Sequence, residues 1–215
     1  MISQFRTVAI VIAAIALTTA VSCSFSVGVG NIETTRISWA ELKDVLLSNE
    51  DVPQYMSKTD EGVMQSERLH SLGREGVETG YGILFQIAPG EDAAAIPLKI
   101  VLSEAELYED SEAAAEAVRV RPGLIVEDST KSGQQVAASE VQVGVIGEQA
   151  SAARLEMVDL NDVQYTILFR QGRILGSVLV VASKDYGENE LLQTGEQLAR
   201  LMADRMQALL DKAGE

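Results

Sequence analysis

The sequence has very little of the side chains on which most metal and nucleophilic sites depend. Its 215 residues include one cysteine, Cys23, and one histidine, His70. A single cysteine excludes an internal disulfide, and a single histidine excludes metal sites built from two or three imidazoles. No Gly-x-Ser-x-Gly elbow accompanies His70, which we interpret as a surface residue near a helix end. We therefore assign no catalytic residue and expect no metal and no cofactor.

Basic residues are also few. Lys and Arg number 17 against 32 Asp and Glu, a net charge of −15. A chain this acidic repels a phosphate backbone, so we expect no nucleic acid partner.

Aromatic residues make up 5% of the chain, and Trp39 is the only tryptophan, so stacking surfaces for sugars are scarce. The densest acidic cluster could still supply the paired carboxylates of a glycoside hydrolase. We expect it instead to be a solvated strand end and helix start. The cluster comprises Glu104, Glu106, Glu109, Asp110 and Glu112.

A second acidic group, Asp159, Asn161 and Asp162, offers oxygen ligands that could bind Ca²⁺. The twelve-residue calcium loop with its central glycine and terminal Glu is absent from this stretch. We expect these residues to form a turn.

The N-terminus carries the clearest functional signal. A short, weakly basic start is followed by ten uncharged apolar residues, Val8 to Leu17. This length is typical of a signal-peptide core, whereas a spanning helix needs about 20 apolar residues. A single-span anchor that continues through Val29 is the alternative.

The next residues, Ala20-Val21-Ser22-Cys23, resemble the lipobox of bacterial lipoproteins. The resemblance implies cleavage between Ser22 and Cys23, with diacylglycerol and further acyl chains such as palmitate on Cys23. Ala20 stands where leucine is usual, so ordinary signal peptidase cleavage after Ala20 is a further alternative. The expected organisation is a signal peptide over residues 1–22, a lipidated cysteine and flexible tether over 23–36, and an extracytoplasmic domain over 37–215.

The first half of this domain mixes helices and strands. Ser38 and Glu41 have the spacing of a capping box, which predicts a helix over 39–47. A second helix is expected over 62–72, and strands over 81–87 and 96–107. Asp110 is a candidate N-cap for a helix over 112–120 that Pro122 and Gly123 end.

The second half predicts strands over 139–145, 155–160, 163–170 and 173–182, the later ones separated by two-residue turns at Asn161-Asp162 and Gln171-Gly172. The run Val178 to Val181 is apolar on both faces, which indicates a central strand with a cover on each side. A long C-terminal helix follows, with Asp185 as its expected cap. Its buried stripe comprises Leu191, Gly195, Leu198, Met202, Met206 and Leu209.

These elements predict one α+β domain with a mainly antiparallel sheet, covered by helices on one or both faces in the manner of an α/β/α sandwich. The layout loosely resembles small extracytoplasmic bacterial lipoproteins of the PsbP-like type, and this resemblance carries over no functional residue. Gly195 within a helix costs about 1 kcal/mol relative to Ala, which indicates close packing over the sheet.

We therefore expect a lipoprotein on the outer face of a bacterial membrane, attached through Cys23. Its partners would be the membrane, through the anchor, and a protein or apolar ligand that the sequence does not identify. The favoured function is non-enzymatic binding, and the alternative is a surface-anchored hydrolase with a carboxylate-based site.

Overall fold

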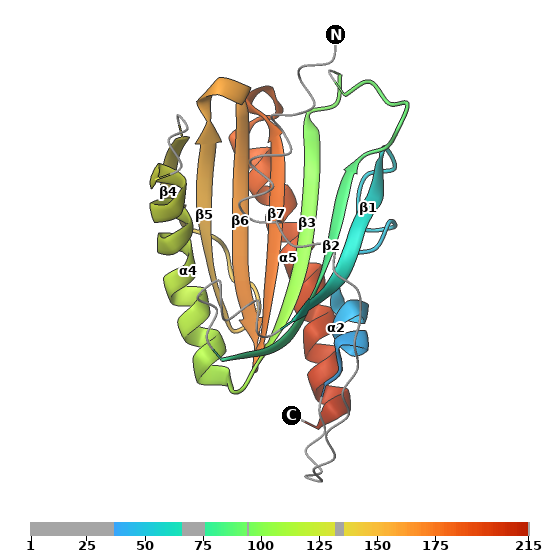
Figure 1. Cartoon of the computed structure of the whole chain (residues 1–215), viewed down its shortest axis with the longest axis vertical. Helices are drawn as coiled ribbons and strands as arrows, with labels where there is room; N and C mark the ends of the chain where they lie inside the picture. Colours follow the sequence, from blue (N-terminus) through green and yellow to red (C-terminus); the bar gives the residue numbers. More distant parts are fainter. Residues whose placement is uncertain (1–36, 66–75, 94, 132–135, 215) are drawn as a thin grey trace. The chain divides into compact units, whose positions relative to one another are not determined.

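The computed structural model describes residues 37–65, 76–93, 95–131 and 136–214. In these residues seven antiparallel strands form one sheet in the order β1-β2-β3-β7-β6-β5-β4 (Figure 1). The strands are β1 (Met56–Gln65), β2 (Val77–Ile87), β3 (Leu98–Tyr108), β4 (Val136–Val141), β5 (Gln149–Met157), β6 (Asp162–Gln171) and β7 (Ile174–Ser183).

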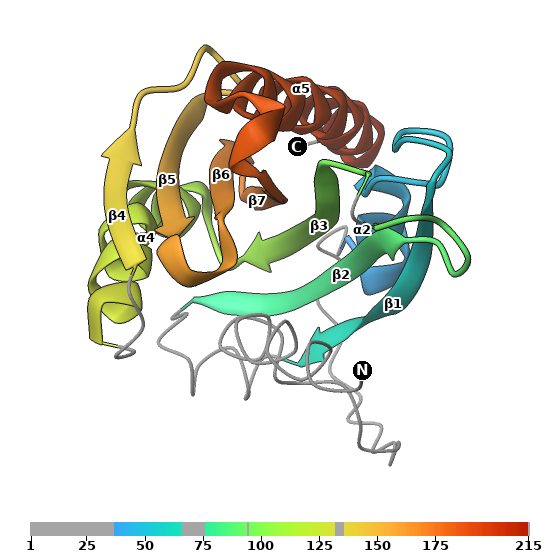
Figure 2. The ribbon, with the colours of Figure 1, turned by 90° about the horizontal axis from the view of Figure 1, so that it is seen from above.

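Helices cover both faces of this sheet (Figure 2). On one face lie α2 (Trp39–Val45) and the long α5 (Glu188–Ala213), and on the other lies α4 (Ser111–Lys131). Adjacent residues of β6 show the division, since Ile167 packs in the core under α5 and Leu168 packs with residues of α4. The predicted α+β fold, with an antiparallel sheet between helices and a long C-terminal helix, is confirmed.

Strand β7 is the middle strand of the sheet, as its apolar run predicts. Val178 and Val180 face α5, while Leu179 and Val181 face the side that carries α4, and all four are buried. A strand buried on both faces needs apolar residues at every position, which is why Val178 to Val181 do not alternate with polar residues.

Helix α5 packs closely on β6 and β7, and the predicted stripe from Leu191 to Leu209 is buried. A Cβ atom placed on Gly195 would lie 2.9 Å from Cδ1 of Ile167 and 3.3 Å from Cγ2 of Val180. The glycine therefore permits close approach of helix and sheet, as expected. Met202 and Met206 are fully buried and belong to the core.

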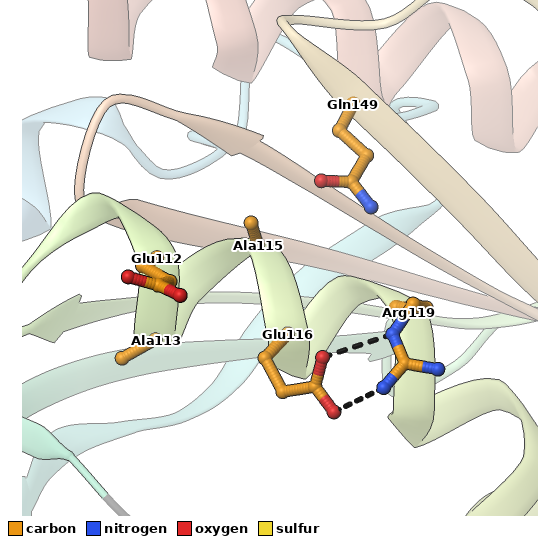
Figure 3. A pocket seen from close by; sticks show the side chains of 6 residues that line it. All are labelled: Glu112, Ala113, Ala115, Glu116, Arg119 and Gln149. Carbon is orange, nitrogen blue, oxygen red and sulfur yellow. Dashed lines mark hydrogen bonds and ion pairs between the residues drawn. The ribbon is translucent and has the colours of Figure 1, made fainter.

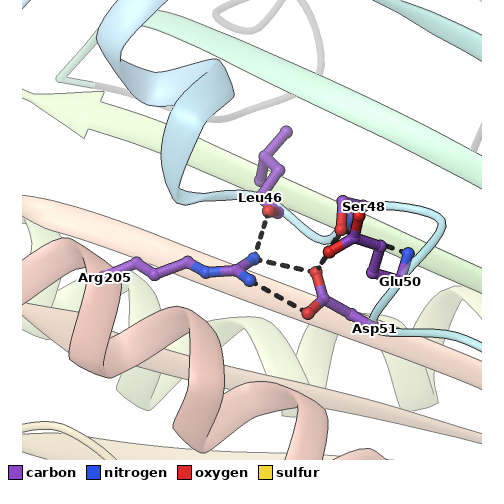
Figure 4. A network of polar contacts seen from close by, with 5 residues as sticks. All are labelled: Leu46, Ser48, Glu50, Asp51 and Arg205. Atoms are coloured by element: carbon purple, nitrogen blue, oxygen red, sulfur yellow. Dashed lines mark hydrogen bonds and ion pairs between the residues drawn. The ribbon is translucent and has the colours of Figure 1, made fainter.

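Helix α2 begins with the predicted capping box. The Ser38 hydroxyl accepts a bond from the Glu41 amide, and the Glu41 carboxylate accepts one from the Ser38 amide at 2.8 Å. After α2, the chain is tied to α5 by Arg205, which donates to both carboxylate oxygens of Asp51 and to the Leu46 carbonyl oxygen at 2.7 Å (Figure 4). The amide and hydroxyl of Ser48 donate to the same carboxylate.

The predicted helix over 62–72 is wrong where the structure describes it. Residues up to Gln65 belong to β1, whose Glu61, Gly62 and Val63 pair with Ile83, Gly82 and Tyr81 of β2. The remainder of that prediction lies outside the described residues. Strand β1 is the edge of the sheet, where backbone pairing on one side suffices and side chains can be polar, so it lacks an apolar alternation.

The predicted end of a helix at Pro122 is also wrong, because α4 continues to Lys131 with Pro122 inside it. Proline has no N–H to donate to the carbonyl four residues earlier, which belongs to Val118. That carbonyl accepts a bond from the Ser151 hydroxyl of β5 at 2.5 Å instead. The sheet thus supplies the donor that the helix lacks. The Asp110 cap is confirmed, since its carboxylate accepts from the Ala113 amide at 2.8 Å.

Three smaller expectations need correction. Strand β5 ends at Met157, and a 3-10 turn, η1 (Val158–Leu160), with Asn161 at φ 53°, replaces the two-residue turn expected at Asn161-Asp162. The last hairpin turns at Gly172 and Arg173, one residue later than expected. Asp185 does not cap α5; it lies in η2 (Lys184–Tyr186), and Gly187 holds the N-cap position at φ 89°.

Candidate functional site

The most deeply buried charges among the described residues lie between β3 and α4. Glu106 of β3 is completely buried, and its two carboxylate oxygens accept bonds from the guanidinium of Arg121 of α4. The Tyr108 hydroxyl donates to the same carboxylate at 3.2 Å, and the Arg121 guanidinium lies 5.9 Å from the Tyr108 ring centre. These three side chains form one cluster, which we call the Glu106 cluster.

Burial by itself lowers the pKa of Arg121, but the charge and hydrogen bonds of Glu106 outweigh burial and hold the pKa above its ordinary value. Arg121 is therefore a permanent cation that neutralises Glu106. A carboxylate engaged through both oxygens is poorly suited to accept or deliver a proton. The Glu106 cluster fastens α4 to the sheet, and sequence patterns could not pair these residues, which come from two different elements.

The acidic cluster of the sequence does not form one site. Glu104 and Glu106 share the sheet face that carries α4, whereas Asp110 caps α4 and Glu109 is exposed in the turn between them. Glu112 is exposed on the first turn of α4. The cluster is thus a strand end followed by a helix start, as expected. The expectation that it is solvated is wrong for Glu106, which is buried and paired with Arg121.

Glu112 also lines a shallow, open depression between α4 and β5 (Figure 3). The other lining residues are Ala113, Ala115, Glu116, Arg119 and Gln149, and the volume is about 380 Å³. This volume would suit a small ligand, but binding sites bury most of the ligand surface and this depression is open. Arg119 and Glu116 pair with each other across one helical turn, so neither charge is directed at a ligand.

A second charged network joins β5 to the start of α5. Arg154 pairs with Glu156 at 2.9 Å and with Glu188 at 2.5 Å, and Lys184 also pairs with Glu156. The hydrogen bonds from Lys184 and Arg154 lower the pKa of Glu156. Residues 154 and 156 are two positions apart on a strand, so their side chains lie on the same face. The sequence alone could therefore have suggested this pair.

The three residues considered as calcium ligands, Asp159, Asn161 and Asp162, do not form a shared metal site. The Asp162 carboxylate pairs with Lys99 at 2.5 Å, while Asp159 and Asn161 are exposed in and after η1. Asp159 and Asn161 thus lie in and after a turn, as expected, whereas Asp162 is the first residue of β6, where its carboxylate pairs with an ammonium group.

An exposed aromatic surface lies where α2 meets the edge of the sheet. Trp39 is 49% exposed and stacks on Tyr81 with ring centres 6.0 Å apart and planes 13° from parallel. Val63, the cross-strand partner of Tyr81, is 46% exposed. The Lys43 ammonium lies 5.5 Å from the centre of the Tyr81 ring. We call Trp39, Tyr81 and Val63 the Trp39 patch; its composition gave no signal in the sequence beyond the single tryptophan.

The remaining sequence candidates lie outside the described residues: Ser22 and Cys23, the expected cleavage and lipid attachment positions, and His70. Among the helices that are described, none is long and apolar enough to span a bilayer.

Comparison with known proteins gives a fold but no family. No family model and no curated protein sequence matches the chain. Among solved structures, the extracellular domain of PknH from Mycobacterium tuberculosis is similar, with a TM-score of 0.56 over 80% of this chain and 97% of that domain. The identity is 8%, so the likeness concerns the fold alone. The chain thus shares its fold with that domain.

Proposed function

We propose that this chain is a lipoprotein held on the extracytoplasmic face of a bacterial membrane, where its domain binds a ligand or partner without catalysing a reaction. The observation that carries the proposal is the shared fold with the extracellular domain of PknH, in a chain that starts with an apolar run and Ala20-Val21-Ser22-Cys23. Two or three acyl chains on Cys23 would make attachment durable, whereas one gives only marginal binding.

The charged clusters support binding over catalysis. Glu106 is held by Arg121, Glu156 by Lys184 and Arg154, and Asp162 by Lys99. General acid and base catalysis needs a side chain within hydrogen-bond reach of the substrate proton, and these carboxylates are already engaged by cations. These pairs stabilise the junctions between elements.

Intact mass spectrometry of protein extracted from bacterial membranes tests the anchor. We expect a mature chain that starts at Cys23 and carries diacylglycerol. Cys23→Ser should abolish this processing, whereas Ser24→Ala should leave it unchanged. A chain that retains Met1 would contradict the proposal, as would unmodified protein released into the medium.

Assays of turnover test the non-catalytic part. The full protein should release no product from esters, glycosides, peptides or phosphoesters. Turnover that is lost in His70→Ala, Glu104→Gln or Asp159→Asn, with the thermal unfolding curve unchanged, would establish the hydrolase alternative and identify the catalytic group.

A further inference from the structure

The Trp39 patch differs from the other exposed apolar residues of the described chain because its exposed tryptophan stacks on a buried tyrosine, Tyr81. One face of the Trp39 indole is covered by Tyr81, while about half of the side chain remains in contact with water. Val63 extends the patch onto β1, the edge strand. Val145 and Val158 are exposed as well, but each lies in a loop or turn.

Two lysines beside the Trp39 patch share one glutamate. Lys43 and Lys58 both pair with Glu61, at 3.1 and 3.0 Å, and the hydrogen bond that Lys43 donates to Glu61 raises the pKa of Lys43. This group of three side chains carries one net positive charge, although the whole chain carries −15. The rim does not add to the repulsion from anionic lipids that the net charge produces.

The Trp39 patch lies only a short distance along the chain from the proposed anchor at Cys23. The 13 residues from Ser24 to Arg36 separate Cys23 from the first described residue, and Trp39 follows two residues after that. A segment of this length spans at most about 45 Å even when fully extended. A linker this short raises the effective concentration of its two ends to the millimolar range, so weak contacts become significant.

We propose that the Trp39 patch rests on the lipid surface to which Cys23 is attached, with the Trp39 indole at the level of the headgroups. Tryptophan is enriched at this depth of membranes because its ring is apolar and its N–H is polar. Lysine side chains can extend their ammonium groups toward water from the same depth. The inference rests on the proposed membrane attachment, and it fixes which side of the domain faces the bilayer and which sides remain open to ligands.

The single tryptophan makes the test direct, since all tryptophan fluorescence comes from Trp39. The full chain would be expressed in bacteria, extracted from the membrane fraction and reconstituted in phosphatidylcholine vesicles, with and without brominated acyl chains. We expect brominated lipid to quench most of the emission and aqueous iodide to quench little. Val63→Ser should weaken the lipid quenching, while Val158→Ser, a comparably exposed valine elsewhere, should leave it unchanged.

Failure of this inference is distinguishable from failure of the anchor. Protein that stays with the vesicles but whose emission responds to iodide and not to brominated lipid would overturn the patch contact and leave the attachment intact. Protection from iodide that appears only with self-association in sedimentation would assign the patch to contact between copies. Protein absent from the membrane fraction would overturn both proposals.

Discussion

The hydroxyl of Ser151 donates a hydrogen bond to the carbonyl oxygen of Val118 at 2.5 Å, where Pro122 deprives α4 of its own donor. The contact links the middle of α4 to β5 and explains how a proline lies inside a 21-residue helix. A side chain from a different element thus completes the helix.

Removing this hydroxyl should destabilise the domain. In Ser151→Ala the buried carbonyl of Val118 loses its donor, which costs about 1–3 kcal/mol of unfolding free energy. In the Pro122→Ala background the helix regains an amide for that carbonyl, so the same substitution should cost markedly less. Urea unfolding of the four proteins in this double-mutant cycle measures the difference. Equal costs in both backgrounds would show that Ser151 acts through other contacts, and Ser139→Ala, exposed on β4, serves as control.

Gly195→Ala should destabilise the protein although alanine favours helices. In an open helix the change would stabilise by about 1 kcal/mol. Here the new Cβ would lie 2.9 Å from Ile167 Cδ1, and overpacking typically costs about 1–3 kcal/mol. Ile167→Val removes the contacting methyl group and should make Gly195→Ala far less costly. Thermal or urea unfolding tests the sign, and a stabilised single variant would refute the close approach.

Arg121→Met should be among the most damaging single substitutions on α4. It leaves the buried Glu106 without its guanidinium, and breaking a buried ion pair from one side costs about 3–5 kcal/mol. Replacing both partners, as Glu106→Leu with Arg121→Met, should cost much less than the single change. Arg119→Met, which breaks the exposed pair with Glu116 on the same helix, should cost far less in the same urea measurements.

The Asp51 and Arg205 pair should make stability depend on pH. Burial raises the pKa of Asp51, but the hydrogen bonds from Arg205 and Ser48 outweigh it and leave the pKa below its ordinary value of 3.8. Because the folded pKa is the lower one, the stabilisation is complete above about pH 4 and is lost as the pH falls through the folded value. Asp51→Asn should therefore lower the unfolding free energy by about 1.5–3 kcal/mol at pH 7 and by less at pH 3.

Urea unfolding at the two pH values measures this effect, with Asp204→Asn, an exposed carboxylate of α5, as the control. An equal loss of unfolding free energy at pH 7 and pH 3 would mean that Asp51 stabilises the fold through contacts that do not depend on its charge.

The sequence predicts those parts of the fold whose signals are local and periodic. The capping box of Ser38 depends on hydrogen bonds within one helix. The stripe of α5 and the apolar run of β7 each reflect the burial of a single element. The sequence failed where a distant residue decides the outcome. β1 is a strand because β2 pairs with it, and α4 passes Pro122 because Ser151 arrives from β5. The Glu106 cluster and the Trp39 patch were not predicted for the same reason, since each is assembled from two or three separate elements.

The sheet consists of two meanders that meet at a single seam. Strands β1 to β3 pair with their sequence neighbours, as do β4 to β7, and only the pairing of β3 with β7 joins residues far apart in the chain, such as Leu98 and Ala182. Closing that seam costs more loop entropy than forming any hairpin, so it should limit the folding rate. In a chain that emerges N-terminus first from a membrane, the edge of β3 that pairs with β7 stays unpaired until β7 and α5 have emerged. The proposed export would therefore leave the first meander open to wrong strand partners until the second half of the chain has crossed the membrane.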